Sequence, residues 1–201
     1  MKRLVVATRN KGKIKEITAL LSGLVESLSS AAELVGFPET VEDGNTFEEN
    51  ALKKAREACL FSGVPALADD SGLVVEALGG GPGVHSARYA GADGDDAANN
   101  AHLLAACRDI PEQSRQAAFV SVLAFVTPQG DEQLFTGRVT GHIISEGRGE
   151  GGFGYDPLFL VDGFDRTMAE LTLEEKNSVS HRARAFVQFK EYLMACNKGL
   201  S

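Results

Sequence analysis

The chain has 201 residues, enough for one sizeable domain with its own hydrophobic core. Its formal net charge of −8 disfavours a polynucleotide backbone as partner, although a few lysines in one place can still hold a small anion. We expect neither a signal peptide nor a membrane-spanning segment, because the apolar runs are too short, and the three cysteines lack the spacing of a disulfide framework or a zinc site. We therefore expect a cytoplasmic protein with reduced thiols.

Strands alternate with helices in the first half of the chain. Residues 4–8 read as a buried strand, and the apolar stripe within KIKEITALLSG predicts a helix that ends shortly before Gly23. A second helix is expected after Thr46, where Glu49 completes a capping box, and Gly63 is placed to end it.

The second half predicts a helix that begins at Asp95 or Asp96, followed by a long hairpin from AAFVSVLAFV and EQLFTGRVTGHII around the turn TPQGD. Thr172 with Glu175 predicts a capping box for a short helix, and a last helix is expected to start at Ser180. This order of elements favours an α/β fold with a mixed sheet.

Basic residues occur at two places where an anion could bind. The segment TRNKGK, residues 8–13, links a strand to a helix, so backbone N–H groups at the helix start and the charges of Lys11 and Lys13 favour an anion site. A polar turn with solvated lysines is the alternative. Lys53 and Lys54 are neighbours on the second helix, so at most one is expected to face a cleft.

Acidic residues occur ahead of the second predicted helix and directly after the short buried strand VPALA. Glu42 and Asp43 form the first pair and Asp69 and Asp70 the second, at an expected strand end. Neighbouring strand residues point to opposite faces, so one aspartate is expected to bind metal or water while the other holds the loop. Two carboxylates from separate elements suffice for Mg²⁺. Solvated loop charge and turn formation are the alternatives.

Two later segments favour recognition of a flat, polar ligand. In GGFGYDP the glycines allow close backbone approach, and Phe153 offers a face on which a nucleobase can stack. In SHRARA, His181 and Arg182 lie at the start of the last predicted helix, where cations oppose the helix dipole. An anion or a base edge would explain their presence. A tight turn with a core phenylalanine, and a solvated basic patch, are the alternatives.

Six segments in order resemble the inosine triphosphate pyrophosphatase family, also called XTP/dITP diphosphatases: TRNKGK, EDGNTFEENALKKA, ADDSGL, GGPGVHSARYAG, GGFGYDPLF and SHRARA. The likeness covers nearly the whole chain. It implies one domain over residues 1–201, with two lobes, a long mixed sheet flanked by helices, an elongated shape and a central cleft. It also implies a homodimer and Mg²⁺-dependent cleavage of deaminated purine nucleoside triphosphates, ITP, dITP and XTP, to monophosphate and pyrophosphate.

The resemblance also implies roles for individual residues. Glu42 and Asp70 would bind Mg²⁺, Asp70 would accept the proton of the attacking water, and Asp69 would support it. The substrate would be bound by residues of six segments: Thr8, Arg9, Asn10, Lys11, Gly12, Lys13, Lys54, Ser71, Phe153, Gly154, Tyr155, Asp156, Lys176, His181 and Arg182. Arg9 and His85 depart from the residues that we expect at these positions in relatives.

Base choice follows from hydrogen-bond polarity. A 6-oxo purine presents an acceptor to donors such as Arg182 and His181, whereas the 6-amino group of ATP leaves such donors unpaired. GTP also has a 6-oxo group, so its rejection must depend on the 2-position. Two rival functions remain at this point: a non-catalytic nucleotide sensor, which would not need Glu42 and Asp70, and a pyrophosphatase for other bases such as modified pyrimidines.

Overall fold

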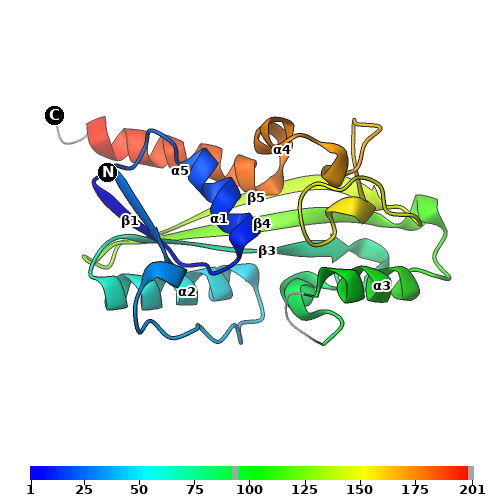
Figure 1. The fold of residues 1–201 in the computed structure, drawn as a ribbon, viewed down its shortest axis with the longest axis horizontal. Helices are drawn as coiled ribbons and strands as arrows, with labels where there is room; N and C mark the ends of the chain where they lie inside the picture. The colour runs from blue at the N-terminus through cyan, green and yellow to red at the C-terminus, as the bar shows by residue number, and fades with distance from the viewer. Residues whose placement is uncertain (92–94, 199–201) are drawn as a thin grey trace. The chain divides into compact units, whose positions relative to one another are not determined.

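The computed structural model describes residues 1–91 and 95–198. The strands and α-helices in these ranges are β1 (Arg3–Val6), α1 (Lys11–Leu20), β2 (Ser27–Ser30), α2 (Phe47–Ser62), β3 (Ala66–Val75), α3 (Asp96–Ala106), β4 (Gln116–Val126), β5 (Glu132–Ile143), β6 (Phe159–Val161), α4 (Leu173–Val179) and α5 (His181–Lys198) (Figure 1). None of the helices in the described ranges is both long and apolar enough to cross a membrane.

The strands form one mixed sheet in the order β2-β1-β3-β4-β5-β6. β1 pairs in parallel with both β2 and β3, with Val5 opposite Ser29 on one side and Ala66 on the other. β6 pairs antiparallel to β5. The predicted α/β class with a mixed sheet is confirmed.

The chain divides into two compact units. Unit 1 comprises Met1–Asp70, Ser121–Gly137 and Arg182–Ser201, and unit 2 comprises Ser71–Val120 and Arg138–His181. Strands β3, β4 and β5 contribute residues to both units.

The helices begin where short polar side chains can satisfy the first backbone N–H groups. Asn10, Thr46, Asp95 and Thr172 cap α1, α2, α3 and α4, each accepting a hydrogen bond from the backbone N–H three residues later. The predicted starts at Thr46, Asp95 and Thr172 are confirmed. The capping box expected at Thr46 is offset, because the Glu49 carboxylate accepts from the N–H of Asn45.

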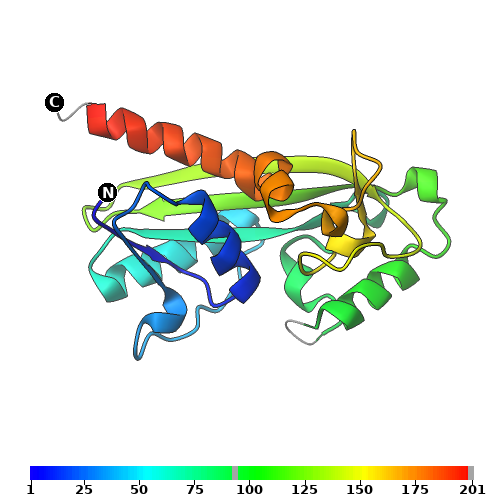
Figure 2. The same cartoon turned by 45° about the horizontal axis from the view of Figure 1, so that its top comes forward.

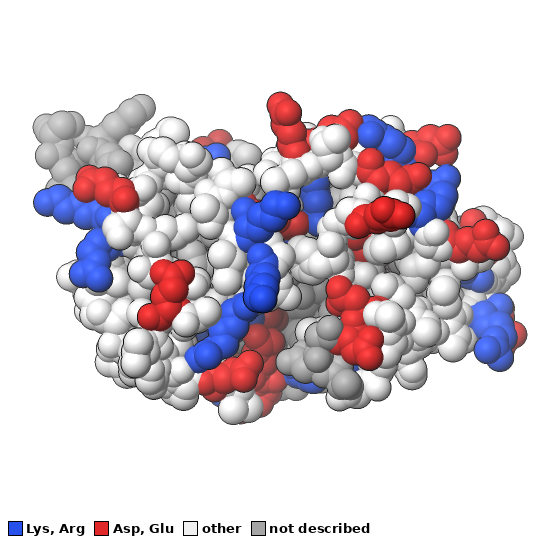
Figure 3. All heavy atoms as spheres, viewed as in Figure 1, with Lys and Arg blue, Asp and Glu red and all other residues white. Residues whose placement is uncertain are grey.

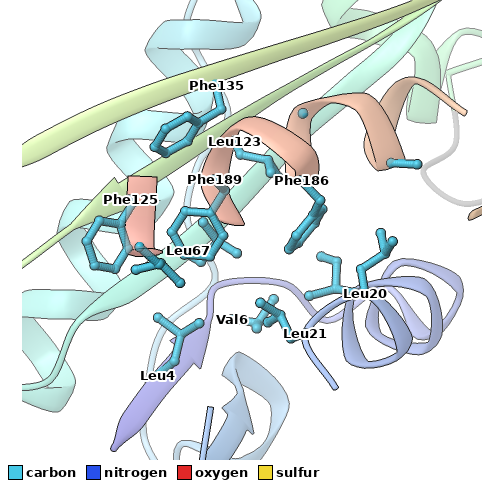
Figure 4. Packing of buried hydrophobic residues seen from close by; sticks show 14 residues of the cluster. Leu4, Val6, Leu20, Leu21, Leu67, Leu123, Phe125, Phe135, Phe186 and Phe189 are labelled. Atoms are coloured by element: carbon cyan, nitrogen blue, oxygen red, sulfur yellow. The ribbon is translucent and has the colours of Figure 1, made fainter. Parts of the chain in front are cut away.

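Unit 1 packs apolar side chains on both faces of its strands. On one face, Leu4 and Val6 of β1 and Leu67 of β3 lie in a cluster with Leu20 of α1 and Phe189 of α5 (Figure 4). On the other face a cluster of mostly small residues packs α2 against the strands, with alanines of α2 against alanines of β3 and β4. Figure 2 shows α2 on one side of these strands and α1 with α5 on the other.

Unit 2 has its own core, which joins β-strand residues to α3 and to the segment after β5. Leu103 and Cys107 contribute from α3 and its C-terminal end, Phe119 and Ile143 from the strands, and Phe159 from β6. This core anchors both α3 and the glycine-rich segment that follows β5, which carries residues singled out by the sequence.

Strand β3 is longer than predicted. The sequence suggested a short strand ending at the acidic pair, but β3 runs from Ala66 to Val75, so Asp69 and Asp70 lie in its middle. The prediction of a strand end was therefore wrong. The two carboxylates can be buried within a strand because cations from α1, α2 and α5 lie against them.

Candidate functional site

The acidic pair of β3 sends its two side chains to opposite faces of unit 1, as strand geometry requires. Asp70 faces α2 and contacts Lys54 and Asn50, whereas Asp69 faces α1 and α5 and contacts Lys13 and Arg182. Both aspartates are at most 4% exposed. The expected division of the pair between two faces is confirmed, and each carboxylate has its own cationic partners.

On the α2 face, one ammonium group joins two carboxylates from distant segments. Lys54 Nζ lies 2.7 Å from Asp70 Oδ1 and 2.8 Å from Glu42 Oε1, and it donates to the Asp69 carbonyl oxygen at 3.0 Å. Its neighbour Lys53 instead pairs with Asp43 at the surface, at 2.7 Å. The two neighbouring lysines thus differ as expected, since Lys54 is buried and Lys53 pairs at the surface.

The arrangement around Lys54 also tests whether these carboxylates suit a divalent cation. Within the described ranges no group of three His, Cys, Asp or Glu side chains converges on a metal-sized space. Two carboxylates, however, already meet at one positive charge, so Glu42 and Asp70 have the reach and direction to share a cation. Mg²⁺ is commonly held by one or two carboxylates with water and phosphate oxygens completing its shell. The residues therefore fit Mg²⁺ that is shared with a phosphate ligand.

Burial and charge act in opposite directions on Asp70. Burial raises its pKa above the usual aspartate value, and the nearby Glu42 carboxylate adds to this, while Lys54 and Lys13 only partly offset it. Burial acts against the charge of Lys54, but Asp70 and Glu42 together outweigh burial and raise the pKa of this lysine. A carboxylate with a raised pKa accepts a proton more readily near neutral pH, which suits Asp70 to the role of general base.

On the α1 and α5 face, Asp69 is held by three side chains. Lys13 Nζ lies 2.9 Å from its Oδ2, the Ser121 hydroxyl donates to its Oδ1 at 2.5 Å, and the Arg182 guanidinium contacts its Oδ2 at 3.2 Å. Burial opposes ionisation of Asp69, but Arg182 and Lys13 outweigh burial and hold its pKa well below the usual value. Asp69 is therefore an anion that organises the cations around it.

Arg182 has a second carboxylate partner, Glu16 of α1, on its other guanidinium nitrogen. Its side chain is only 1% exposed; burial disfavours its charge, but the two carboxylates outweigh burial and raise its pKa. The sequence assigned Arg182 to a base pocket. Its guanidinium contacts Asp69 and Glu16, and these two anions account for a cation at the start of α5.

Two ammonium groups converge beside Asp70. Lys13 Nζ and Lys54 Nζ both donate to the carbonyl oxygen of Asp69, at 3.4 and 3.0 Å. Basic side chains also gather at the surface over α1 (Figure 3). In the preceding loop, Asn10 caps α1, and the Arg9 guanidinium donates to the Phe37 carbonyl at 2.5 Å. This concentration of cations around a carboxylate pair suits a polyanionic ligand.

Unit 2 holds a second polar cluster in the glycine-rich segment. Lys176 Nζ of α4 lies 2.6 Å from Asp156 Oδ2 and 4.9 Å from the centre of the Phe153 ring. The same Asp156 oxygen accepts from the Phe153 N–H at 3.0 Å. Gly152 has φ +77°, and a Cβ there would lie 2.0 Å from this oxygen, so any other residue would be strained and would displace the Asp156 carboxylate. Asp156 thus fixes Phe153 and Lys176 together.

The other sequence-predicted residues of unit 2 have mixed surroundings. The Tyr155 side chain lies in the core and donates its hydroxyl to the Ser86 carbonyl at 2.8 Å, and burial raises its pKa. His181 is buried and stacked on Phe119 with ring centres 5.0 Å apart. Ser71 is a half-buried residue of β3.

Sequence reasoning missed Glu16, Ser121 and Asn50, although each carries a signal. Glu16 occupies a position of the buried stripe of α1, three residues after Lys13. Ser121 interrupts an otherwise apolar strand, and Asn50 is fully buried in α2, where its side chain accepts from the Gly44 N–H and donates to Asp70. A polar residue in a buried row needs a partner, so each of them pointed to a buried polar network.

Comparison with known proteins agrees with these motifs. Residues 4–192 match the Ham1 family. The chain is 56% identical to a dITP/XTP pyrophosphatase of Geobacter sulfurreducens, with 96% of this chain and 97% of the relative covered. It is 51% identical to a dITP/XTP pyrophosphatase of Desulforamulus reducens, with 95% of each covered.

Solved structures of Ham1 proteins have the same fold as this chain. A HAM1 protein from Coxiella burnetii superposes with a TM-score of 0.87 at 40% identity, covering 97% of this chain and 100% of that one. The Ham1 protein of Staphylococcus aureus superposes with a TM-score of 0.85 at 38% identity, covering 96% of this chain and 98% of that one. On sequence and fold alike, this chain belongs to the Ham1 family.

Proposed function

We propose that the protein is a Mg²⁺-dependent pyrophosphatase that hydrolyses dITP, ITP and XTP to the nucleoside monophosphate and pyrophosphate. The observation that carries this proposal is the meeting of Glu42 and Asp70 at one cation, Lys54, beside Lys13. The dITP/XTP pyrophosphatases that are more than 50% identical over nearly their full length support the same substrate class. A pure nucleotide sensor would have no need for this carboxylate pair.

In this proposal the residues of unit 1 bind and cleave the triphosphate. Lys13, Lys54 and the loop residues Thr8 to Gly12 hold the phosphate oxygens. Glu42 and Asp70 hold Mg²⁺, which when bound would neutralise phosphate charge and polarise the phosphorus under attack. Asp70 takes a proton from the attacking water. The water oxygen bonds to the α-phosphorus, and the bond from that phosphorus to the α–β bridging oxygen breaks, so pyrophosphate leaves with the bridging oxygen.

The residues of unit 2 recognise the base. Phe153 stacks on the purine, and Lys176, held by Asp156, donates to the 6-oxo oxygen. His181 and the backbone of Gly154 and Tyr155 complete the base-recognition residues. Ser71 also contacts the substrate. Arg182 acts on the substrate through Asp69 and Lys13. We propose that residues 1–201 are one catalytic domain.

A substrate panel with product identification tests the proposed function. With Mg²⁺ and dITP the protein should release dIMP and pyrophosphate, and dATP should be a poor substrate. Release of single phosphate would contradict cleavage at the α–β bond. Tight dITP binding without any product over hours would favour the sensor, and faster turnover of a modified pyrimidine triphosphate would favour the other base preference.

Replacing Phe153 tests the base-recognition part. Stacking of a base on an aromatic side chain contributes about 1–3 kcal/mol, so Phe153→Leu should raise the KM for dITP roughly ten- to hundredfold. Phe153→Tyr keeps a flat face and should retain the KM of the wild type. Inhibition by pyrophosphate, which has no base, should be equal in all three proteins. An unchanged KM in Phe153→Leu would remove Phe153 from the base site.

Lys54 is expected to compete with metal in the nucleotide-free protein. Its ammonium group lies between Glu42 and Asp70, so Lys54→Met should bind Mn²⁺ roughly ten- to hundredfold more tightly than the wild type, because hydrogen bonds between charged groups contribute about 1.5–3 kcal/mol. Titration of Mn²⁺ by electron paramagnetic resonance measures this without any turnover. Lys53→Met is the matched control and should leave Mn²⁺ binding unchanged. Weaker or equal binding in Lys54→Met would place the metal elsewhere.

We also propose that the protein works in the cytoplasm as a homodimer. Cys59 and Cys107 are buried free thiols, in keeping with a reducing compartment. Leu60 and Val35 are large apolar side chains that are 88% and 96% exposed, and a second copy could cover such residues. Light scattering after gel filtration gives the mass in solution, and a mass of one chain across micromolar concentrations would contradict the dimer.

A further inference from the structure

Helix α3 contacts the base-recognition loop, here residues 151–156, through two side chains that no motif singled out. The Asp96 carboxylate accepts a hydrogen bond from the Gly154 N–H at 2.7 Å, and the Asn100 amide donates to the Gly154 carbonyl at 2.9 Å. The two side chains are four residues apart and therefore share one face of α3. Together they hold the peptide groups on both sides of Gly154.

Helix α3 is itself firmly held within unit 2. Leu103 is fully buried in the core of this unit. Asn99 donates to the Ala87 carbonyl at 3.1 Å and accepts from the Ala90 N–H at 2.7 Å. A helix fixed by its own core and by a second loop provides a rigid support for the peptide groups that it contacts.

The contacted peptides lie next to the residues that are proposed to meet the base. Gly154 follows Phe153 directly and adopts the left-handed conformation, with φ +63°. On its other side, Phe153 is held through its N–H by Asp156, which also binds Lys176. The direction of the Phe153 ring therefore depends on two supports: Asp156 within the loop and α3 outside it.

We propose that Asp96 and Asn100 are positioning residues for base recognition, which hold Phe153 so that a stacked purine presents its 6-oxo oxygen to Lys176. This inference rests on the proposed function, because it assigns α3 to the same base site. Neither residue needs to touch the nucleotide. Their effect is on the affinity and selectivity for the base, whereas the phosphate chemistry belongs to residues of unit 1.

Two substitutions of the exposed Asp96 provide a matched test. Asp96→Ala removes the acceptor and leaves the Gly154 N–H without it. In Asp96→Asn the side-chain amide oxygen can still accept this hydrogen bond, so this variant controls for loss of charge. We expect Asp96→Ala to raise the KM for dITP roughly tenfold and to narrow the preference for dITP over dATP, with kcat changed less than about threefold. Asp96→Asn should stay close to the wild type.

Asn100→Asp provides a second variant of nearly unchanged shape. It replaces the donor with an oxygen that faces the Gly154 carbonyl, so it should change KM and selectivity in the same direction as Asp96→Ala. Wild-type KM and wild-type selectivity in both Asp96→Ala and Asn100→Asp would overturn the inference. An equal fall in kcat for all substrates with unchanged KM would also overturn it, because that result indicates general damage.

Hydrogen exchange of the loop separates this inference from the proposed function. Mass spectrometry of peptides covering 151–156 should show faster exchange in Asp96→Ala than in Asp96→Asn, whether or not dITP is a substrate. If the wild type did not hydrolyse dITP, the proposed function and the role in base selection would both fail. If the wild type did hydrolyse dITP and loop exchange were equal in all variants, only the assignment of α3 would fail.

Discussion

Asp70→Asn is expected to lower kcat for dITP by about 10²–10⁴-fold, the usual contribution of a general base. The asparagine keeps the shape of the side chain and can still accept a hydrogen bond from Lys54. It cannot take the proton of water, and it removes one of the two carboxylates that are proposed to hold Mg²⁺. Steady-state release of pyrophosphate at saturating Mg²⁺ measures the effect. Near-normal turnover would remove Asp70 from its assigned role.

The same substitution should leave the fold intact. The pKa of Asp70 is raised in the folded protein, so the folded state binds this proton more tightly than the unfolded chain does. Such a group favours folding below the ordinary aspartate pKa and costs stability as the pH rises through the raised value. At neutral pH a neutral asparagine avoids that cost, and Lys54 keeps Glu42 as its carboxylate partner, so the protein should remain folded. Asp43→Asn, which alters a surface ion pair next to Glu42, is the control and should keep both activity and fold.

Arg182→Met should lower the free energy of unfolding by about 3–5 kcal/mol, the usual effect of removing one partner from a buried ion pair. Two buried carboxylates, those of Asp69 and Glu16, would lose their shared cation. Arg184→Met, in the same turn of α5 but exposed, should change stability by no more than about 0.5 kcal/mol. Urea unfolding at neutral pH measures both, and equal stability of the two variants would contradict the account of α5.

The loss of unfolding free energy in Arg182→Met should depend on pH in one direction. The pKa of Asp69 is held well below 3.8 in the folded protein, so its ion pairs stabilise the fold above the ordinary aspartate pKa and cease to do so as the pH falls toward the lowered value. The gap in unfolding free energy between the wild type and Arg182→Met should therefore narrow as the pH is lowered through and below about 4. A gap that widens in acid would show that Asp69 is not the relevant partner.

Local signals in the sequence were sufficient for most helices. The caps Thr46, Asp95 and Thr172 depend on residues three positions away, so a single stretch of chain contains the whole interaction. The meeting of Glu42 with Asp70, expected from the resemblance, agrees with the structure because both carboxylates contact Lys54.

Long-range partners set the limit of prediction. Asp69 is stable inside β3 because Arg182, 113 residues later, supplies a charge that no local pattern reveals. Without that partner, the sequence indicated a strand that ends before the aspartates. The contact between Arg182 and Glu16 was equally out of reach: a cation at a helix start signals a nearby anion, but sequence alone cannot show that Glu16 lies there.

The order of strands was also beyond local reasoning. β1 lies between β2 and β3, and its neighbours differ in their distance along the chain, so only the packed structure fixes the order β2-β1-β3. In unit 2, the contacts of Asp96 and Asn100 with Gly154 join segments that are 58 and 54 residues apart in the chain. Such contacts leave no periodic trace in the sequence.

The most direct test of the account is a crystal structure with Mg²⁺ and a dITP analogue whose α–β bridging oxygen is replaced by an imino group. We predict Mg²⁺ bound by the carboxylates of Glu42 and Asp70 and by phosphate oxygens, with the Lys54 ammonium moved from between the carboxylates onto a phosphate. Mg²⁺ held by other side chains, with Lys54 still joining Glu42 to Asp70, would contradict it.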